Sequence, residues 1–299
     1  MFFIANHPIY NHPLPEGHRF PMLKYELLPK QLLHEGTAEC TDFYSPDSID
    51  LSLVHAVHTV SYVKALTELT LDAKAVRSIG FPLSAALVER ELRIAQGTVV
   101  GCNHALEHGI AFNIAGGTHH AFSDRGEAFC LLNDQAIATQ YLINQKKCHK
   151  ILIVDLDVHR GNGTAEIFQN NADVITFSMH GQSNYPFRKE TSDYDIALPD
   201  KTDDSTYLAI LQETLPELLN IHRPDFVFYL AGVDILGTDK LGKLGCTLEG
   251  CKTRDSYVLG LCKSLGIPVQ VSMGGGYSPA IKTIIEAHAN TYRVARALY

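Results

Sequence analysis

The 299-residue sequence predicts an open, multilayered α/β fold in which helices cover a parallel sheet. In the second half of the chain, short β-rich runs alternate with longer segments of helical periodicity. These runs are apolar on both faces, which is typical of buried parallel strands. Polar residues follow three of them directly, at the carboxyl ends where open α/β sheets bind ligands.

The elements are expected in the following order. The N-terminal run MFFIANHPIY indicates a first strand, and residues 46–110 are mostly helical in pattern. Further strands are expected at 151–155, 174–178, 226–230 and 269–273. Helices are expected at 163–170, 205–222, 251–265 and 279–298. No repeat or Pro/Gly/Ser-rich linker divides the chain, so we expect a single domain over 1–299.

The composition argues against several classes of protein. Apolar residues at 45% and charged residues at 19% describe an ordinary globular core. The longest apolar runs, such as 226–233, are far shorter than the ~18 residues that span a bilayer, so no membrane segment is expected. The net charge of −8, without a long basic run, argues against nucleic-acid binding. Seven cysteines without a C-x-x-C pair favour a reducing compartment, and we expect a cytoplasmic protein.

The segment DLDVH at 155–159 leaves one of the expected strands. With a side-chain period of two, Asp155, Asp157 and His159 would share one face. Asp157 and His159 could then bind one ion, and Asp234, at the end of another strand, would complete the set. Three protein ligands with an open fourth position are typical of catalytic zinc. In the alternative interpretation, one aspartate caps a helix and His159 is a packed core residue.

Two neighbouring histidines follow two glycines in GGTHHA at 116–121. Adjacent residues on a strand point apart, so His119 and His120 reach one site only if the backbone turns, which glycines permit. A histidine pair beside a metal-bound water suits acid–base catalysis, because imidazole titrates near neutral pH. The alternative is a pair of histidines in an exposed loop.

Three further residues complete the candidate site. Asp155 and Asn162 are spaced to orient one histidine each, which would fix the tautomers of the rings. GGGY at 274–277 places the phenol of Tyr277 on a backbone that can approach closely, where its O–H could donate to an oxyanion. The alternative is that this stretch is only a turn.

Together with other segments, these motifs resemble the signature sequences of the histone deacetylase superfamily. The matching segments, in the family's order, are PEGHRFP at 15–21, His58 with Tyr62, GGTHHA at 116–121, AFCLLND at 128–134, DLDVHRGNGT at 155–164, AGVDILGTDKLG at 231–242 and GGGY at 274–277. The chain is most similar to the class IV branch. The resemblance implies an arginase-like, three-layer α/β/α fold with a central, mostly parallel sheet. It also implies zinc-dependent removal of acetyl or longer fatty acyl groups from the lysine side chains of a protein or peptide.

The resemblance also implies roles for individual residues. Asp157, His159 and Asp234 match the ligands of one zinc ion per chain, His119 and His120 match the catalytic histidines, with His120 as general base, and Tyr277 matches the carbonyl-polarising tyrosine. The substrate-binding candidates are Phe129 and Tyr185 as tunnel walls, with Gly275, Gly276 and His18. Structural potassium or sodium is expected at Asp155, Asp157, His159, Ser178 and Met179, and at Phe168, Asn171, Val174 and Tyr194. Asn162 stands where many relatives have Asp, so His120 would lack a charged partner.

Three other functions remain compatible with the sequence. An acetylpolyamine amidohydrolase of the same superfamily would use the same site on a small cation. An arginase-type hydrolase would hold two manganese ions, but the strand ends lack the additional carboxylates of a bridged pair. A non-catalytic acyl-lysine-binding module would have no use for His119, His120 and Tyr277 together. The sequence gives no indication of the oligomeric state.

Overall fold

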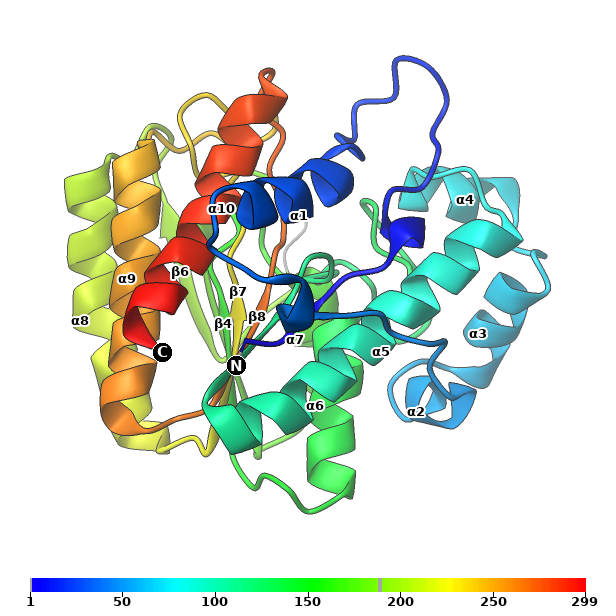
Figure 1. Cartoon of the computed structure of the whole chain (residues 1–299). Coiled ribbons are helices and arrows are strands. Elements are labelled where there is room, and N and C mark those ends of the chain that lie inside the picture. Colours follow the sequence, from blue (N-terminus) through cyan, green and yellow to red (C-terminus); the bar gives the residue numbers. More distant parts are fainter. Residues whose placement is uncertain (1, 188–189) are drawn as a thin grey trace.

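The computed structural model describes residues 2–187 and 190–299, and its strands form one eight-stranded sheet (Figure 1). In chain order the strands are β1 Ile4–Ala5, β2 Phe43–Tyr44, β3 Ile110–Asn113, β4 Ile151–Asp155, β5 Val174–Gly181, β6 Tyr194–Leu198, β7 Phe226–Leu230 and β8 Val269–Ser272. In space they follow the order β2-β1-β3-β8-β7-β4-β5-β6, and every pairing is parallel. The predicted α/β class with a central parallel sheet is confirmed.

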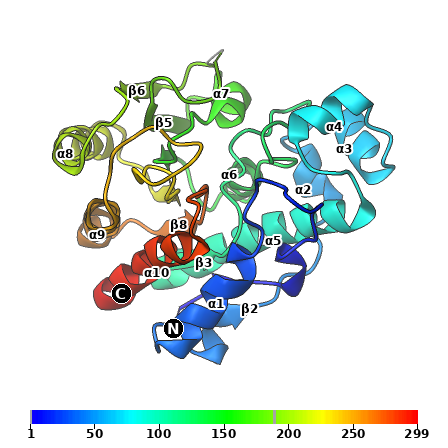
Figure 2. The same ribbon diagram turned by 90° about the horizontal axis from the view of Figure 1, so that it is seen from above.

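Helices cover both faces of this sheet (Figures 1 and 2). They are α1 Lys24–His34, α2 Leu51–His55, α3 Val60–Thr67, α4 Ala73–Ile79, α5 Ala85–His108, α6 Asp134–Asn144, α7 Asn162–Phe168, α8 Asp204–His222, α9 Leu248–Leu265 and α10 Ile281–Leu298. The long helix α5 packs on β3 and β8 and also contacts α6. On the other side, α9 contacts both α8 and α10, and α1 packs against α10.

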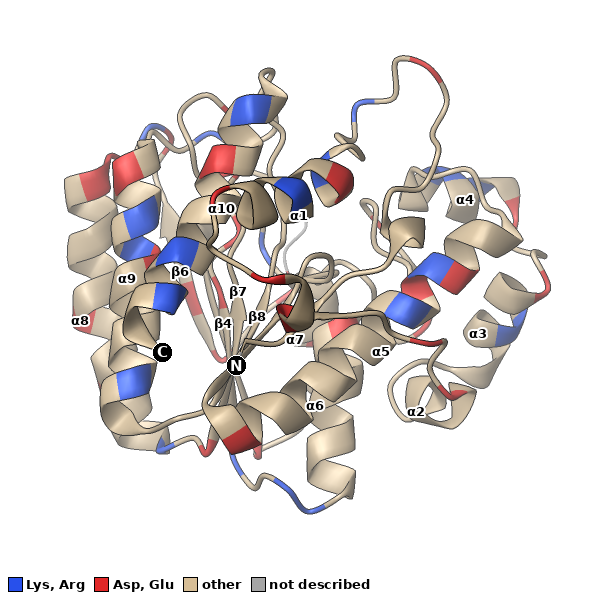
Figure 3. Ribbon diagram, in the orientation of Figure 1, with Lys and Arg blue, Asp and Glu red and all other residues tan. Residues whose placement is uncertain are grey.

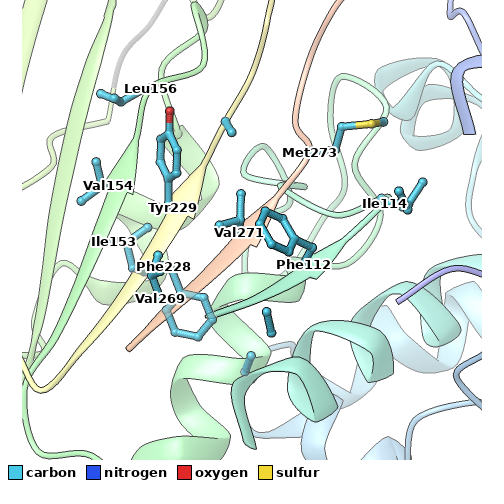
Figure 4. Close-up of a cluster of buried hydrophobic side chains, with 14 of the residues drawn as sticks. Phe112, Ile114, Ile153, Val154, Leu156, Phe228, Tyr229, Val269, Val271 and Met273 are labelled. Atoms are coloured by element: carbon cyan, nitrogen blue, oxygen red, sulfur yellow. The ribbon is translucent and has the colours of Figure 1, made fainter. Parts of the chain in front are cut away.

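Side chains on one face of the sheet hold α10 and α9 against it. On β3, Phe112 points toward α10, where its ring lies 4.5 Å from that of Tyr292. On β7, Tyr229 donates a hydrogen bond to Asp255 of α9 at 2.5 Å. Figure 4 shows the apolar side chains of β3, β4, β7 and β8 packed into one buried cluster. Strands that are buried on both faces explain why the sequence shows continuous apolar runs rather than alternation.

Capping residues decide where the helices begin and end. The hydroxyl of Ser84 accepts a hydrogen bond from the Leu87 amide at the start of α5, and Gly109 ends that helix with φ +91°. Thr247 caps α9 in the same way, so this helix begins three residues before the predicted 251. Gly266, with φ +66°, ends it.

The sequence-based prediction missed α1, α6 and three of the strands. β3 has only four residues and follows α5 directly, so its apolar residues extend the helical pattern assigned to 46–110. β6 is an edge strand whose residues are mostly half-buried, and it lacks a continuous apolar run. The N-terminal strand exists but is only two residues long in the described part of the chain.

Charged residues of both signs are interspersed on the outer helices. Figure 3 shows acidic and basic positions close together on α1, α5, α9 and α10. Some of them pair within one helix, as Lys30 does with Glu26 and Arg93 with Glu89. No helix in the described residues is long and apolar enough to cross a membrane.

The strand order positions the candidate site. β3, β8, β7 and β4 are neighbours in the centre of the sheet, and all four run in the same direction. The segments that follow them carry GGTHHA, GGGY, Asp234 and DLDVH respectively. Four motifs that are far apart in the sequence therefore leave the sheet at the same edge.

Candidate metal centre and active site

The segment after β4 brings Asp157 and His159 together by a turn, not by an extended strand. β4 ends at Asp155, whose carboxylate accepts a hydrogen bond from the Asp157 amide at 3.1 Å. The Asp157 carboxylate accepts one from the His159 amide at 2.9 Å in the same manner. Asp157 and His159 do meet, but the predicted reason, the side-chain period of two in an extended strand, is therefore wrong. Aspartates that bind their own backbone two residues ahead shape the segment instead.

Asp157, His159 and Asp234 form a buried three-residue cluster. Nδ1 of His159 lies 3.0 Å from Oδ1 of Asp157 and 3.2 Å from Oδ2 of Asp234. The remaining oxygens bind backbone amides, because Asp157 Oδ2 accepts from Gly275 at 2.8 Å and Asp234 Oδ1 from Val158 at 3.0 Å. Ligand atoms of a tetrahedral zinc ion, with bonds of about 2.0–2.2 Å, lie about 3.3 Å apart. The separations in the cluster are close to this value.

The charges in this cluster favour a cation. Burial and the charge of Asp157 raise the pKa of Asp234 to about 7. Burial lowers the pKa of His159, but Asp157 and Asp234 outweigh it and raise the value to about 10. Oδ2 of Asp234 is buried, and among the described residues Nδ1 of His159 is the polar group beside it. Two buried carboxylates beside one imidazole form a nitrogen-and-oxygen donor set that suits a zinc-type ion.

The two adjacent histidines follow a turn of two glycines. Gly116 and Gly117 have φ values of +83° and +74°, which residues with a side chain rarely adopt. Asp134, at the start of α6, holds this turn by accepting hydrogen bonds from the amide and hydroxyl of Thr118 at 3.0 and 2.8 Å. As a result, the rings of His119 and His120 lie side by side, with centroids 4.1 Å apart. The turn required for both imidazoles to reach one site is present.

Each histidine has its own buried partner. Nδ1 of His119 lies 2.6 Å from Oδ2 of Asp155, and Nδ1 of His120 lies 2.6 Å from Oδ1 of Asn162. An amide oxygen only accepts, so Nδ1 of His120 carries the proton and Nε2 is left as an acceptor. Burial lowers the pKa of His119, but Asp155 outweighs it and raises the value above the ordinary one. Burial holds the pKa of His120 well below its usual range, and the charges of the neighbouring His119 and His159 add a smaller effect in the same direction.

Tyr277 reaches the site from the glycine turn after β8. The Tyr277 amide donates to Oδ2 of Asp239 at 2.6 Å, and its ring stands edge-on to His159 with centroids 6.3 Å apart. The turn approaches the cluster so closely that a Cβ at Gly275 would lie 2.0 Å from Oδ2 of Asp234. Glycine is therefore required at this position.

A cavity of about 460 Å³ connects these groups to the surface. His119, His120, Asp157, His159 and Tyr277 line it, together with both predicted tunnel walls. Phe129 is held at φ +70° by an amide hydrogen bond to Ile79, and Tyr185 stands perpendicular to His120 and donates to Glu127 at 2.6 Å. Phe187 lies at the cavity and is 92% exposed. The cavity is also lined by Tyr25, Arg90 and Ile94.

Two of the substrate-binding candidates lie outside the cavity lining. His18 is not among the lining residues, because its Nε2 lies 2.9 Å from the Gly80 carbonyl and its ring packs behind Phe129. Gly276 faces away as well, since a Cβ there would meet Val233 and His288. Gly275 does line the cavity. Direct substrate contact by His18 or Gly276 is thus not supported by this geometry.

The residues predicted to hold structural cations occupy two places. Asp155 pairs with Ser178 across β4 and β5, and Met179 follows on β5 next to them. Phe168, Asn171 and Val174 lie between the end of α7 and the start of β5, and Tyr194 begins β6. The amides of Asn171 and Val174 donate to the carbonyls of Phe168 and Asn171 at 2.9 and 3.2 Å. Cation binding at both places stays a prediction.

Some residues of the site were not predicted from the sequence. Asp239 and Glu127 orient Tyr277 and Tyr185 through single hydrogen bonds, and Asp134 fixes the glycine turn before the histidines. Asp134 and Asp239 lie within the segments that carry the family resemblance, but nothing local indicates which distant group each one binds. Arg90 and Ile94 are on α5, where helical spacing indicates only core packing.

Comparison with known proteins decides the family. The family described as "Histone deacetylase domain" matches residues 18–292. The chain belongs to the histone deacetylase family. This histone deacetylase family protein is 46% identical over 298 residues to an uncharacterized protein of Picosynechococcus sp., covering 100% of this chain and 99% of the relative. It is 28% identical to Histone deacetylase 2 of Arabidopsis thaliana over 279 residues, which cover 90% of this chain and 72% of the relative.

Solved structures confirm the fold of this histone deacetylase family protein. A crystal structure described as an HDAC homolog complexed with SAHA superposes with a TM-score of 0.86. The superposition covers 100% of this chain and 84% of the other, at 22% sequence identity. The expected arginase- and deacetylase-like arrangement is therefore present. Membership in the class IV branch stays a prediction.

Proposed function

We propose that the protein is a zinc-dependent deacylase that hydrolyses acetyl or longer fatty acyl groups from lysine side chains of a protein or peptide. One observation carries the proposal: the three-residue cluster, both histidines and Tyr277 line or adjoin one cavity with aromatic walls. Asp157, His159 and Asp234 would hold the zinc ion. A binding module for acyl-lysine needs no histidine pair with separate Asp155 and Asn162 partners.

The chain's own residues can perform amide hydrolysis. When bound, zinc supplies Lewis-acid polarisation of the amide carbonyl and acidifies water. Nε2 of His120 accepts the proton of the attacking water, because Asn162 keeps the proton of the ring on Nδ1. The phenol of Tyr277 donates to the oxygen that becomes negative. One of the two histidines then protonates the leaving nitrogen, so that amide and water become the lysine amine and a carboxylic acid.

The geometry favours a single metal ion. In residues 2–187 and 190–299, one group of three metal-binding side chains converges on a point, and it contains Asp157, His159 and Asp234. A bridged manganese pair needs carboxylates shared between two ions. Asp155, two residues before Asp157, is hydrogen-bonded to His119 and is therefore not placed to bridge a second ion.

A substrate panel tests the proposed function. If the proposal is right, zinc-loaded protein should release lysine peptide from acetyl-, decanoyl- or myristoyl-lysine peptides faster than it hydrolyses acetylated polyamines. Product formation is followed by mass spectrometry. Preference for an acetylated polyamine would replace the proposal by the amidohydrolase alternative. Binding of acyl-lysine peptides without any turnover would replace it by a binding module.

Tyr277→Phe should lower kcat by about 10²- to 10³-fold, the effect of removing one oxyanion donor. The change removes only the hydroxyl, so zinc content and folding should stay as in the wild type. Steady-state kinetics with zinc quantification measures both. Tyr292→Phe is the matched control, because Tyr292 is a buried tyrosine of α10 that packs on Phe112. Full activity of Tyr277→Phe would exclude this role for the phenol.

A further inference from the structure

Lys24, the first residue of α1, is a fully buried lysine beside the glycine turn that carries Tyr277. Its side chain is 0% exposed, and its Nζ donates a hydrogen bond to the carbonyl of Gly274 at 3.0 Å. The two residues are 250 positions apart in the sequence. They meet because α1 packs against α10, which follows the GGGY segment (Figures 1 and 2).

Aromatic rings surround this ammonium group. Its Nζ lies 5.2 Å from the ring centroid of Phe20, 5.4 Å from that of Tyr25 and 5.6 Å from that of Tyr277. A cation within about 6 Å of a ring centroid is attracted by the ring's quadrupole. In the described residues, Lys24 forms no salt bridge. One carbonyl and three ring faces therefore hold the group in place.

The charge of Lys24 persists in this environment. Burial lowers the pKa of Lys24 to about 8, while the charges of Asp234 and Asp157 oppose that effect. The neighbouring His288 cannot replace the charge, because burial and Lys24 hold its pKa well below the usual range. Burying an ammonium group without a carboxylate contact lowers the stability of the folded protein. Packing alone therefore does not explain why Lys24 is buried here, whereas a role that needs its charge does.

The glycine turn depends on anchors from outside. Gly274 and Gly276 have φ values of +70° and +155°, and none of the three glycines has a side chain to hold it. Two anchors are backbone hydrogen bonds, from the Gly274 amide to Gly116 and from Val233 to the Gly275 carbonyl. The others come from side chains: Lys24 binds the Gly274 carbonyl, Asp157 the Gly275 amide and Asp239 the Tyr277 amide. Of these three side chains, Lys24 is the cation, and it also lies against the ring of Tyr277.

We propose that Lys24 is a positioning residue for the reaction, which fixes the phenol of Tyr277 in the orientation for donation to the substrate oxygen. It does so by binding the Gly274 carbonyl and by lying against the Tyr277 ring. A displacement of about 1 Å in an active site can cost about 10²-fold in rate. Lys24 is not among the residues that line the cavity, so it acts through Tyr277 rather than on the substrate.

The test is a double-mutant cycle between Lys24 and Tyr277. Lys24→Met, which keeps the length and removes the charge, should lower kcat by about 10- to 100-fold and leave KM within about twofold. In the Tyr277→Phe background the same change should lower kcat by less than about twofold, because the hydroxyl that Lys24 positions is already absent. Lys30→Met, on the exposed face of the same helix, is the matched control.

The outcomes of this cycle are distinct. Unchanged kcat in Lys24→Met, or an equal loss in both Tyr277 backgrounds, would overturn the proposal. If Lys24→Met does not accumulate as folded protein, Lys24→Leu takes its place, because Leu likewise lacks both the charge and the donor for Gly274. The same criteria then apply to it. Lys24→Arg, which restores the cation, should recover part of the lost kcat.

This inference rests on the proposed function, so a second measurement does not depend on turnover. Calorimetry gives the affinity for an alkyl hydroxamate, which carries a carbonyl oxygen as the substrate amide does, so that Tyr277 would donate to both. Lys24→Met should weaken binding in the wild-type background and leave it unchanged in the Tyr277→Phe background. A wild-type protein that hydrolyses no acyl substrate but shows this coupling would refute only the proposed function. Full activity and unchanged hydroxamate binding in Lys24→Met would refute only the role of Lys24.

Discussion

Asp234→Ala should yield a folded protein that retains neither stoichiometric zinc nor turnover. The change removes Oδ2, which lies 3.2 Å from Nδ1 of His159 and has no other partner in the described part of the chain. Loss of an outer hydrogen-bond partner already costs about 10- to 100-fold in metal affinity, and loss of a direct ligand should cost more. Zinc content after dialysis, measured by atomic emission, and initial rates on an acyl-lysine peptide measure the two effects.

Two variants separate metal binding from folding in this experiment. Asp234→Asn keeps an oxygen that can accept from the Val158 amide, but it lacks the negative charge, so it should bind zinc weakly while folding normally. Asp173→Ala removes a carboxylate with an exposed side chain near β5 and should retain metal and activity. A zinc-replete, active Asp234→Ala protein would show that the ligand set is wrong.

His120→Ala should lower kcat by about 10²- to 10⁴-fold and leave zinc content unchanged, the effect of removing a general base. His120 is the histidine whose Nε2 is free to accept a proton, because Nδ1 lies 2.6 Å from the oxygen of Asn162. It is also the histidine whose pKa is held well below its usual range by burial, so it stays neutral before the reaction. Single-turnover kinetics separates this loss of chemistry from any change in product release.

His119→Ala and His55→Ala complete this comparison. His119 pairs with Asp155 and has a raised pKa, so its loss should affect protonation of the leaving amine rather than the attack of water. His55 is exposed on α2, and its replacement should leave the rates unchanged. Equal kcat values for His120→Ala and wild type would reassign the general base.

The parts of the site that could be predicted are those carried by residue type at a strand end. Carboxylate and imidazole groups after β4 and β7 indicated a metal site, because parallel strands bring their carboxyl ends to one edge. The local conformation of the segment after β4 could not be predicted from residue types alone. The sequence pattern predicts an extended DLDVH segment, but each of its aspartates accepts a hydrogen bond from the amide two residues ahead, and this turn decides which atoms converge.

Contacts between distant segments could not be predicted in this way. Lys24 and Gly274, Glu127 and Tyr185, and Asp239 and Tyr277 meet only after the helices have packed on the sheet. A lysine at the start of an amphipathic helix is ordinarily exposed, so the pattern of α1 gives no sign that Lys24 is buried. The short strands β2, β3 and β6 were missed for a related reason, since their partners and not their own composition make them strands.

The place of β8 in the sheet links activity to the completion of synthesis. β8, at 269–272, lies between β3 and β7 and pairs with both. Until it emerges from the ribosome, the strands β2, β1 and β3 have no partner that joins them to β7, β4, β5 and β6. Before that point, only contacts outside the sheet, such as His119 with Asp155 and His120 with Asn162, can connect the histidines after β3 to the segment after β4. A product that ends before β8 lacks both the strand that joins the two parts of the sheet and Tyr277, which follows that strand.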